Sequence, residues 1–264
     1  MDKLSKIFVF ILIVSAPLVF YKYFYKPKVK HTGKNIITEA PAKKPEIALI
    51  FDDLGESPRD LTEIQSLDIP VTVSIIPGLK FSKSIAQTAK LYGFSVMTHI
   101  PLEPKNAQKY ETAKYKFISS SMPRRERLAL LRYYLNYIRV AIGVNNHMGS
   151  AATEDPRLMK ELMKAVKYNG LFFIDSRTSN SSVACEAAKK EGVVCDSNGG
   201  FIDAVEDVNA MQNKFFELIK KAEENQKLIV IAHPRKKTFF LLHKLLPKAR
   251  ERVKFVTIKD YLGL

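Results

Sequence analysis

Short apolar runs alternate with amphipathic stretches over most of the chain beyond residue 46. Runs of four to six β-branched or apolar residues have the length of strands. Continuous apolar runs of this kind are typical of parallel strands that are covered on both faces. We expect strands at 47–51, 71–76, 94–98, 171–174, 228–232 and 254–258, with weaker ones near Val144 and Val193.

Between these runs, apolar residues recur every three or four positions, as they do on the buried face of a helix. One such stripe covers 128–142 and follows Pro123 in the first turn. A second covers 155–170, where Asp155 can cap the first turn and Asn-Gly ends the pattern. A third runs from about residue 207 to 222. We interpret all three stripes as core faces of helices.

The alternation of strands and helices, without an internal repeat, predicts an α/β fold built on a parallel sheet or barrel. A doubly wound sheet that binds nucleotides would carry a Gly-rich turn after its first strand, and this chain has none there. We therefore predict a distorted (β/α) barrel with about seven parallel strands. Residues 46–264 are enough for one such domain.

The N-terminal segment predicts attachment to a membrane or export. Residues 7–21 are apolar or small and follow two lysines, so we assign 1–25 to a signal anchor or signal peptide and 26–45 to a Lys- and Pro-rich tether. No small-x-small cleavage site follows, which favours a retained anchor. The lysines beyond residue 25 outnumber those before it, which by the positive-inside rule would favour a cytoplasmic domain instead. We expect the periplasmic side of the cell envelope, anchored in the inner membrane or secreted.

The distribution of charge indicates which partners to expect, and the two cysteines bear on the cellular compartment. The formal net charge is +15, of which residues 1–46 hold +6. The most concentrated basic and aromatic run directly follows the apolar segment, and no nucleic-acid module is recognisable, so we expect a membrane interface and envelope polymers rather than nucleic acid. Cys185 and Cys195 are spaced for a small disulfide loop in an oxidising compartment, while two unpaired thiols remain an open alternative.

Polar residues of catalytic type follow nearly every predicted strand. The carboxyl ends of barrel strands meet on one face, where active sites are found, so we expect these side chains to converge. They are Asp52, Asp53, His99, His147, Asp175 and His233.

Each of these residues also has a structural interpretation. A single His at a strand end more often makes a structural hydrogen bond, and adjacent carboxylates followed by Gly55 can form a turn. Two charges directly after a buried strand, however, are costly unless positive charge meets them. We predict a divalent metal site, zinc by preference, formed by Asp53, His99 and His147, with coordination positions left open for water and substrate.

Five ordered segments resemble the divergent polysaccharide deacetylase family, which is related to the NodB-type carbohydrate deacetylases. The likeness covers about residues 46–262. The segments are IFDDLG (50–55), THIPLEP (98–104), GVNNHMGS (143–150), FIDSRT (173–178) and IAHPR (231–235).

The resemblance implies a distorted (β/α) barrel and metal-dependent removal of acetyl groups from an acetylated polysaccharide or a peptidoglycan-like glycan. It makes Asp52 the general base, Asp53 a metal ligand and His233 the acid that protonates the leaving group. Asp175 is a further catalytic candidate. Residues expected to contact the substrate or support the site are Glu103, Asn145, Asn146 and Arg177.

Two departures from the wider pattern matter. NodB-type enzymes take both histidines from one short segment, but Glu103 stands four residues after His99, so the second imidazole must come from His147. Where the divergent branch usually shows an Arg-Asp pair before an apolar-Leu-Asp segment, this chain reads Asn198-Gly199-Gly200-Phe201-Ile202-Asp203. A catalytic charge missing there motivates an alternative, a non-catalytic module that binds glycan or protein. Hydrolysis of a phosphoester by the same ion is a third hypothesis, with Arg177 and the basic run 235–237 near the mouth.

Overall fold

Eight parallel strands form one sheet within the residues that the computed structural model describes, 43–110 and 114–264. The strands are β1 (Glu46–Leu54), β2 (Thr72–Ile75), β3 (Ser95–Leu102), β4 (Gly143–Met148), β5 (Phe172–Asp175), β6 (Cys195–Ser197), β7 (Lys227–Ala232) and β8 (Lys254–Val256). Seven are hydrogen-bonded in the order β6-β5-β4-β3-β2-β1-β7, and β8 pairs with the first residues of β1. The predicted strands are all present, with β6 starting at Cys195 rather than near Val193.

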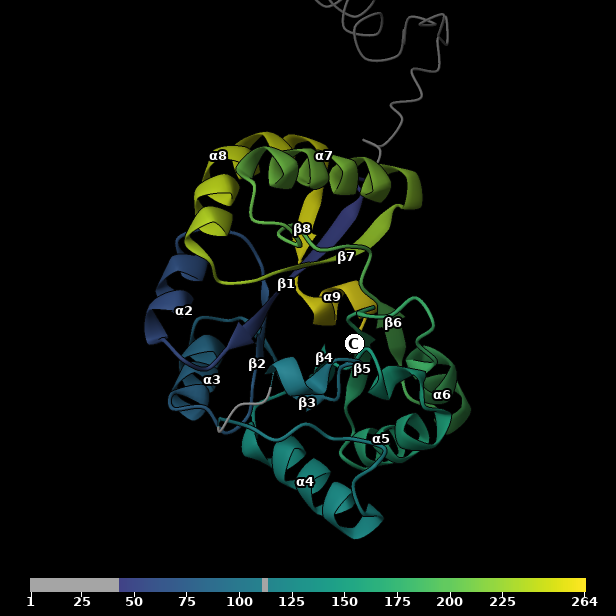
Figure 1. Cartoon of the computed structure of the whole chain (residues 1–264). Helices are drawn as coiled ribbons and strands as arrows, with labels where there is room; N and C mark the ends of the chain where they lie inside the picture. The colour runs from purple at the N-terminus through teal and green to yellow at the C-terminus, as the bar shows by residue number, and fades with distance from the viewer. Residues whose placement is uncertain (1–42, 111–113) are drawn as a thin grey trace, which may run out of the picture. The chain divides into compact units, whose positions relative to one another are not determined.

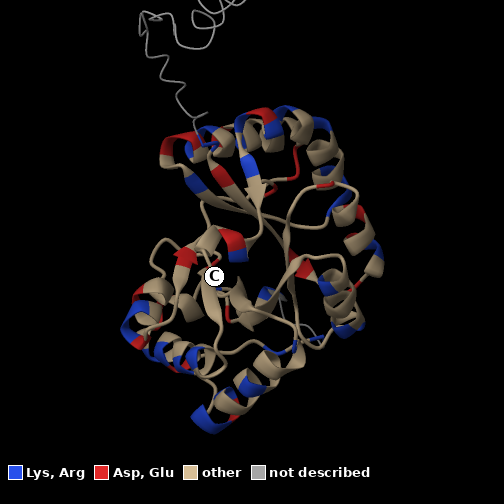
Figure 2. Ribbon diagram, turned by 180° about the vertical axis from the view of Figure 1, so that it is seen from behind, with Lys and Arg blue, Asp and Glu red and all other residues tan. Residues whose placement is uncertain are grey.

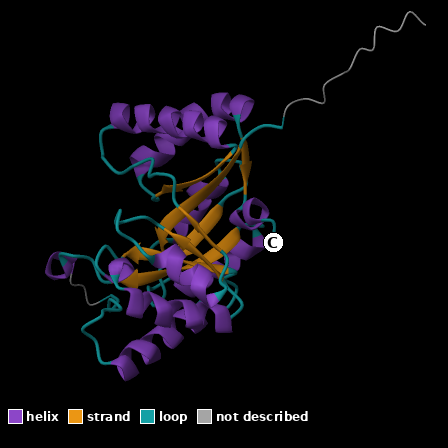
Figure 3. Cartoon of the chain, turned by 90° about the vertical axis from the view of Figure 1, so that its right-hand side faces the viewer, coloured by secondary structure: helices purple, strands orange, loops and turns teal. Residues whose placement is uncertain are grey.

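Helices surround this sheet, which lies in the middle of the domain (Figures 1 and 3). Lys and Arg are spread over these outer helices, whereas most of the strand ribbon is uncharged (Figure 2). The α-helices are α2 (Pro58–Gln65), α3 (Ser82–Leu91), α4 (Arg124–Tyr137), α5 (Pro156–Tyr168), α6 (Ala184–Glu191), α7 (Val208–Asn225), α8 (Lys236–Arg252) and α9 (Ile258–Leu262). Two short 3₁₀ helices are η1 (Ala107–Tyr110) and η2 (Ala152–Glu154). Helix α4 ends earlier than its apolar stripe predicted, at Tyr137.

Strand β1 is apolar over most of its length because both of its faces are buried. Ile47, Leu49 and Phe51 pack outward in one cluster with residues of the covering helices. Ala48 and Ile50 face the other side, in the interior cluster of the curled sheet. The same interior cluster contains Ile258 and Tyr261 of α9, and the Ile258 N–H donates to Thr72 Oγ1 at the start of β2. Apolar side chains and α9 therefore fill the barrel toward the N-terminal ends of its strands, which leaves the opposite end for chemistry.

The backbone after β6 closes the barrel against β7. Gly199 N–H donates to the Ile229 carbonyl at 2.8 Å, and Ile202 N–H donates to the Ile231 carbonyl at 3.0 Å. A Cβ at Gly199 would lie 2.8 Å from Leu228 Cγ and 3.0 Å from the Ile229 carbonyl oxygen, so a larger residue would force the buried Leu228 side chain or the backbone to shift. The Asn-Gly-Gly departure noted in the sequence thus has a structural cause at Gly199. The expected distorted (β/α) barrel is confirmed.

Cys185 of α6 and Cys195 of β6 form a disulfide bond, with their Cα atoms 5.5 Å apart. This resolves the two alternatives that their spacing left open. The bond joins a covering helix to the short strand at one end of the sheet.

Among the described residues, no helix combines the length and the apolar character needed to cross a bilayer. The predicted anchor at 1–25 and most of the tether at 26–45 lie outside the described residues and stay predictions.

Helix α5 begins as its sequence predicted, and its cap gives a first test of the fold. Asp155 accepts hydrogen bonds from the N–H groups of Arg157 and Leu158 at 2.8 and 3.2 Å. We expect Asp155→Ala to lower the free energy of unfolding by about 1 kcal/mol and Tm by roughly 2–4 °C, because two N–H groups lose their acceptor. Asp155→Asn keeps an acceptor oxygen, so its unfolding free energy should fall much less than that of Asp155→Ala.

The same cap predicts a pH dependence. The hydrogen bond from Ser120 holds the pKa of Asp155 below its ordinary value. A carboxyl with a lowered pKa in the folded state contributes stability above its unfolded pKa, and this contribution disappears as the pH falls through the folded value. Thermal melts should therefore show the full difference in Tm between wild type and Asp155→Ala at pH 7, and this difference in Tm should decrease as the pH falls. A difference that is constant from pH 7 to pH 2 would contradict this role.

Candidate metal centre

The end of β1 presents two consecutive carboxylates to the same site. In a regular strand Asp52 and Asp53 would face opposite sides of the sheet. The pairing of β1 with β2 shifts register between Phe51 and Leu54, and Asp53 has a φ of 63°. A bulge of this kind redirects a side chain next to a functional site. The irregularity therefore places both carboxylates where β3 and β4 end.

Asp53, His99 and His147 converge as the sequence predicted. His99 Nε2 lies 3.1 Å from Asp53 Oδ1, and His147 Nδ1 lies 2.7 Å from the same oxygen. One ligand atom from each residue falls within 4.8 Å of the others. Both imidazoles are buried, while the Asp53 carboxylate is 35% exposed. The three side chains come from β1, β3 and β4 and converge on one point.

Asn145 fixes the orientation of His99. Its Oδ1 accepts from Ser74 Oγ and lies 2.7 Å from His99 Nδ1, and its Nδ2 donates to Asp52 Oδ1 at 2.8 Å. The donation to Asp52 identifies which side of the amide is oxygen, so His99 must carry its proton on Nδ1. In the neutral ring, the lone pair on Nε2 then points toward Asp53, which is the arrangement that a metal ligand needs.

Tyr115 plays the equivalent part for His147. Its hydroxyl lies 2.8 Å from His147 Nε2, and the two rings meet edge to face with centroids 5.3 Å apart. The outer nitrogen of this imidazole is therefore engaged, and Nδ1 faces Asp53. The donor set fits a divalent cation, because one carboxylate and two imidazoles present inward-facing atoms while partners hold the outer nitrogens.

Asp52 lies beside this trio but is more deeply buried. Its side chain is 2% exposed, and Oδ2 lies 3.7 Å from His99 Nε2. Burial raises the pKa of the Asp52 carboxyl above its ordinary value. For Asp53, burial alone would raise the pKa, but the neighbouring His147 and His99 imidazoles, when they carry the positive charge, hold it well below its ordinary range. The two neighbouring carboxylates thus differ in basicity, as ligand and base should.

His233 follows β7 and approaches from the other side of the centre. Its Nε2 lies 3.8 Å from Asp53 Oδ2, and its Nδ1 lies 2.8 Å from Asp203 Oδ1. Asp203 is 1% exposed and also accepts from the His233 N–H and from Thr238 Oγ1. The Phe201 ring stacks on the imidazole with centroids 5.9 Å apart. Burial alone would lower the pKa of His233, but the Asp203 hydrogen bond and the Asp53 charge raise it.

The remaining predicted residues lie around this centre. Asp175 ends β5, and its carboxylate accepts from the Arg177 N–H at 2.8 Å. Asn146 accepts from the Ser176 N–H and donates to the Met148 carbonyl, which ties β4 to the loop after β5. Within the described residues, no hydrogen bond or ion pair joins the Asp175 carboxylate to the trio. The catalytic role of Asp175 and the substrate roles of Glu103, Asn146 and Arg177 stay predictions.

Sequence reasoning missed two residues of this centre, Tyr115 and Asp203. Tyr115 lies in a segment without helix or strand periodicity, so nothing local marked it. Asp203 entered the sequence analysis only as the last residue of the stretch 198–203. It follows two apolar residues and stands 30 residues before His233, a spacing that could have suggested a partner for this histidine.

Comparisons with known proteins give a family match and two related sequences. The family described as divergent polysaccharide deacetylase matches residues 49–262. An uncharacterized protein of Haemophilus influenzae is 33% identical over 235 residues, which cover 86% of this chain and 83% of that protein. The uncharacterized protein YibQ of Escherichia coli is 27% identical over 208 residues, which cover 78% of this chain but only 64% of that protein.

Solved structures share the fold. An uncharacterized protein of Agrobacterium tumefaciens has a TM-score of 0.76 at 20% identity, covering 84% of this chain and 90% of the other. The chitin deacetylase of Colletotrichum lindemuthianum has a TM-score of 0.54 at 13% identity, covering 84% and 89%.

The trio predicts a metal-binding stoichiometry. We expect about one divalent ion per chain. His99→Ala and His147→Ala should weaken the affinity by more than the roughly 10- to 100-fold that loss of an outer partner causes, because each removes a ligand. Metal analysis after dialysis measures this, with circular dichroism to confirm folding. His243→Ala, on the exposed side of α8, is the matched control. Full metal content in both ligand variants would rule out this site.

The Tyr115 hydroxyl gives a finer test of the same site. Tyr115→Phe keeps the ring and removes the partner of His147 Nε2, so the metal affinity should fall roughly 10-fold. Competition with a chromophoric chelator measures the affinity, and Tyr92→Phe, which alters an exposed ring, should not change it. An unchanged affinity in Tyr115→Phe would show that the hydroxyl does not support the ligand.

Proposed function

Because the chain belongs to the divergent polysaccharide deacetylase family, we propose that it removes acetyl groups from N- or O-acetylated carbohydrate of the cell envelope with the help of a divalent cation. One observation carries this proposal: Asp53, His99 and His147 meet within 4.8 Å, and a second, buried carboxylate lies beside them. Metal-assisted hydrolysis of an acyl bond uses a bound cation as the electrophile and a neighbouring carboxylate as the base. The mixed Asp and His donors favour zinc.

The cation, when bound, would polarise the acetyl carbonyl and make water nucleophilic near neutral pH. Asp52 accepts the proton of the attacking water, since its pKa is raised by burial and Asn145 holds it in place. Asn145 also holds His99, so one amide positions the base relative to a ligand.

His233 delivers a proton to the leaving amine or alcohol on the opposite side. The Asp203 carboxylate receives Nδ1–H, which fixes the ring and stabilises its charged form, and Nε2 is left facing the centre. The stacked Phe201 ring restricts rotation of this imidazole. The two proton-transfer groups therefore approach from different strands, β1 and the end of β7.

Several contacts bear on the two alternative functions, a non-catalytic binding module and phosphoester hydrolysis. Gly199 in the stretch 198–203 serves the closure of the barrel, and Asp203 at its end supplies a carboxylate to His233. Of the four cations considered for phosphate, three donate to backbone carbonyls: Arg177 to Asn180, Arg235 to Asp203 and Lys237 to Glu206.

An envelope location is part of the proposal. The Cys185–Cys195 disulfide supports it, because thiols in the cytosol are kept reduced. The proposed substrate is then an acetylated, peptidoglycan-like glycan of the envelope.

Asp52→Asn separates catalysis from metal binding. We expect acetate release from acetylated glycans to fall by roughly 10²- to 10⁴-fold, because the base is lost while all three ligands remain. Acetate release and metal content are measured on the same preparation, and Asp60→Asn on α2 is the control. Metal-loaded wild type that releases no acetate from a broad panel of N- and O-acetylated glycans would refute the proposed function.

A further inference from the structure

A second cavity, of about 860 Å³, lies between α3 and α4, two of the helices that surround the sheet (Figure 1). We call it the α3–α4 cavity. Ala86 and Ile138 are part of its lining, and both also belong to the buried core cluster, so its floor is fixed to the domain. The cavity shares no lining residue with the metal centre. It is therefore a separate place at which a ligand could bind.

Three cations line this cavity, Lys83, Arg132 and Arg139, and among the described residues no acidic side chain lines it. Across residues 43–110 and 114–264, none of the three forms an ion pair with a carboxylate. The Lys83 ammonium group lies over the Tyr137 ring, 4.6 Å from its centroid, a contact that positions the charge without neutralising it. The sequence has no Asp or Glu from 69 to 102 or from 127 to 153. The cavity thus carries an uncompensated positive charge.

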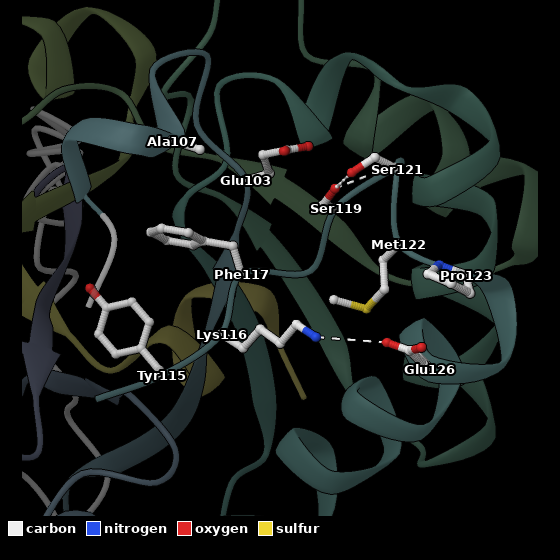
Figure 4. A pocket seen from close by; sticks show the side chains of 10 residues that line it. All are labelled: Glu103, Ala107, Tyr115, Lys116, Phe117, Ser119, Ser121, Met122, Pro123 and Glu126. Carbon is white, nitrogen blue, oxygen red and sulfur yellow. Dashed lines mark hydrogen bonds and ion pairs between the residues drawn. The ribbon is translucent and has the colours of Figure 1, made fainter. Parts of the chain in front are cut away.

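Comparable cations on neighbouring surfaces do have partners. On the side of α4 that faces α5, Arg124 and Arg127 both pair with Glu161, at 3.0 and 2.9 Å. A cavity of about 610 Å³ beside the metal centre has Lys116 in its wall, and this lysine lies 3.7 Å from Glu126 (Figure 4). Like charges that share one cavity repel one another unless an anion lies between them. The unpaired cations of the α3–α4 cavity therefore favour an anionic ligand.

The number of cations indicates which anion fits. A carboxylate or a phosphodiester carries a single negative charge, whereas a phosphomonoester carries about −1.5 to −2 at pH 7 and presents three acceptor oxygens. Two guanidinium groups and one ammonium group match that charge and can donate to all three oxygens, because a guanidinium offers two parallel N–H groups. The charges of this cavity are thus better matched by a phosphomonoester than by a carboxylate.

The cavity also has room and a surface for the organic part of such a ligand. The Tyr133 and Tyr137 rings line it, with centroids 5.4 Å apart. Tyr133 is 51% exposed, so its ring is open to a ligand from solvent. Aromatic rings pack against apolar or ring-shaped groups, while their hydroxyls stay available for hydrogen bonds. A phosphate attached to an apolar or ring-shaped group would use both parts of the lining.

We propose that the α3–α4 cavity binds a phosphomonoester, with Lys83, Arg132 and Arg139 around the phosphate and the tyrosine rings against the organic part. The ligand is a soluble phosphomonoester or a lipid with a phosphomonoester headgroup, because both present the same charged group. This site does not depend on the removal of acetyl groups at the metal centre.

Titration calorimetry on the full-length chain, kept in a neutral detergent because of the apolar segment 7–21, tests the site. The probes are phenyl phosphate, inorganic phosphate and benzoate. Phenyl phosphate should bind most tightly, because inorganic phosphate lacks a ring and benzoate carries a single charge. Arg132→Gln and Arg139→Gln should each weaken the binding of phenyl phosphate about tenfold, since each removes a charge-assisted hydrogen bond.

A third variant tests the aromatic wall. Tyr133→Ala should weaken the binding of phenyl phosphate several-fold and leave that of inorganic phosphate nearly unchanged, because only the contact with the ring is lost. Arg157→Gln, which removes an exposed arginine of α5, is the matched control and should change neither affinity. Circular dichroism confirms that each variant is folded.

The source of the ligand follows from comparing dihexanoylphosphatidic acid with sn-glycerol 3-phosphate, its headgroup without acyl chains. Tighter binding of the lipid, weakened by Arg132→Gln, assigns a lipid ligand, and equal or weaker binding of the lipid assigns a soluble one. Both results support the site. It is overturned if no phosphate probe binds, if benzoate binds as tightly as phenyl phosphate, or if neither arginine substitution changes the affinity.

Discussion

Two adjacent carboxylates at the end of a buried strand create a need for positive charge, and the surrounding structure is arranged around that need. Burying a carboxylate without a partner is costly. Asp52 and Asp53 reach the same site only because β1 is irregular there and Asp53 adopts a left-handed backbone conformation. The imidazoles of His99 and His147 meet Asp53, and a shared cation would compensate both carboxylates at once.

The barrel supplies the rigidity that such a site requires. Its interior is filled with apolar side chains and α9 at one end, so polar groups collect at the other. Asn145 and Tyr115 hold the outer nitrogens of the two imidazoles, and Asp203 does the same for His233. Every histidine of the centre therefore has a fixed orientation before any ligand arrives. The function proposed for the chain follows from this preorganisation together with its family membership.

The convergence of Asp53, His99 and His147 could be predicted because parallel strands appear in the sequence as apolar runs. The polar residues that follow such strands lie at the same edge of the sheet. The sequence could not predict Tyr115, since the segment before α4 has no periodicity and lies 32 residues from His147. The packing role of Gly199 could not be predicted for a similar reason, because its close approach to Leu228 exists only in the closed barrel. The spacing of Cys185 and Cys195 permitted a disulfide but could not decide between a bond and free thiols.

A crystal of the metal-loaded protein, measured at the absorption edge of the bound metal, tests the central claim most directly. The account predicts one anomalous peak within bonding distance of Asp53, His99 and His147, with Asp52 next to it but not ligating. A peak bound by other residues, or no peak at this centre in a protein that carries stoichiometric metal, would contradict it.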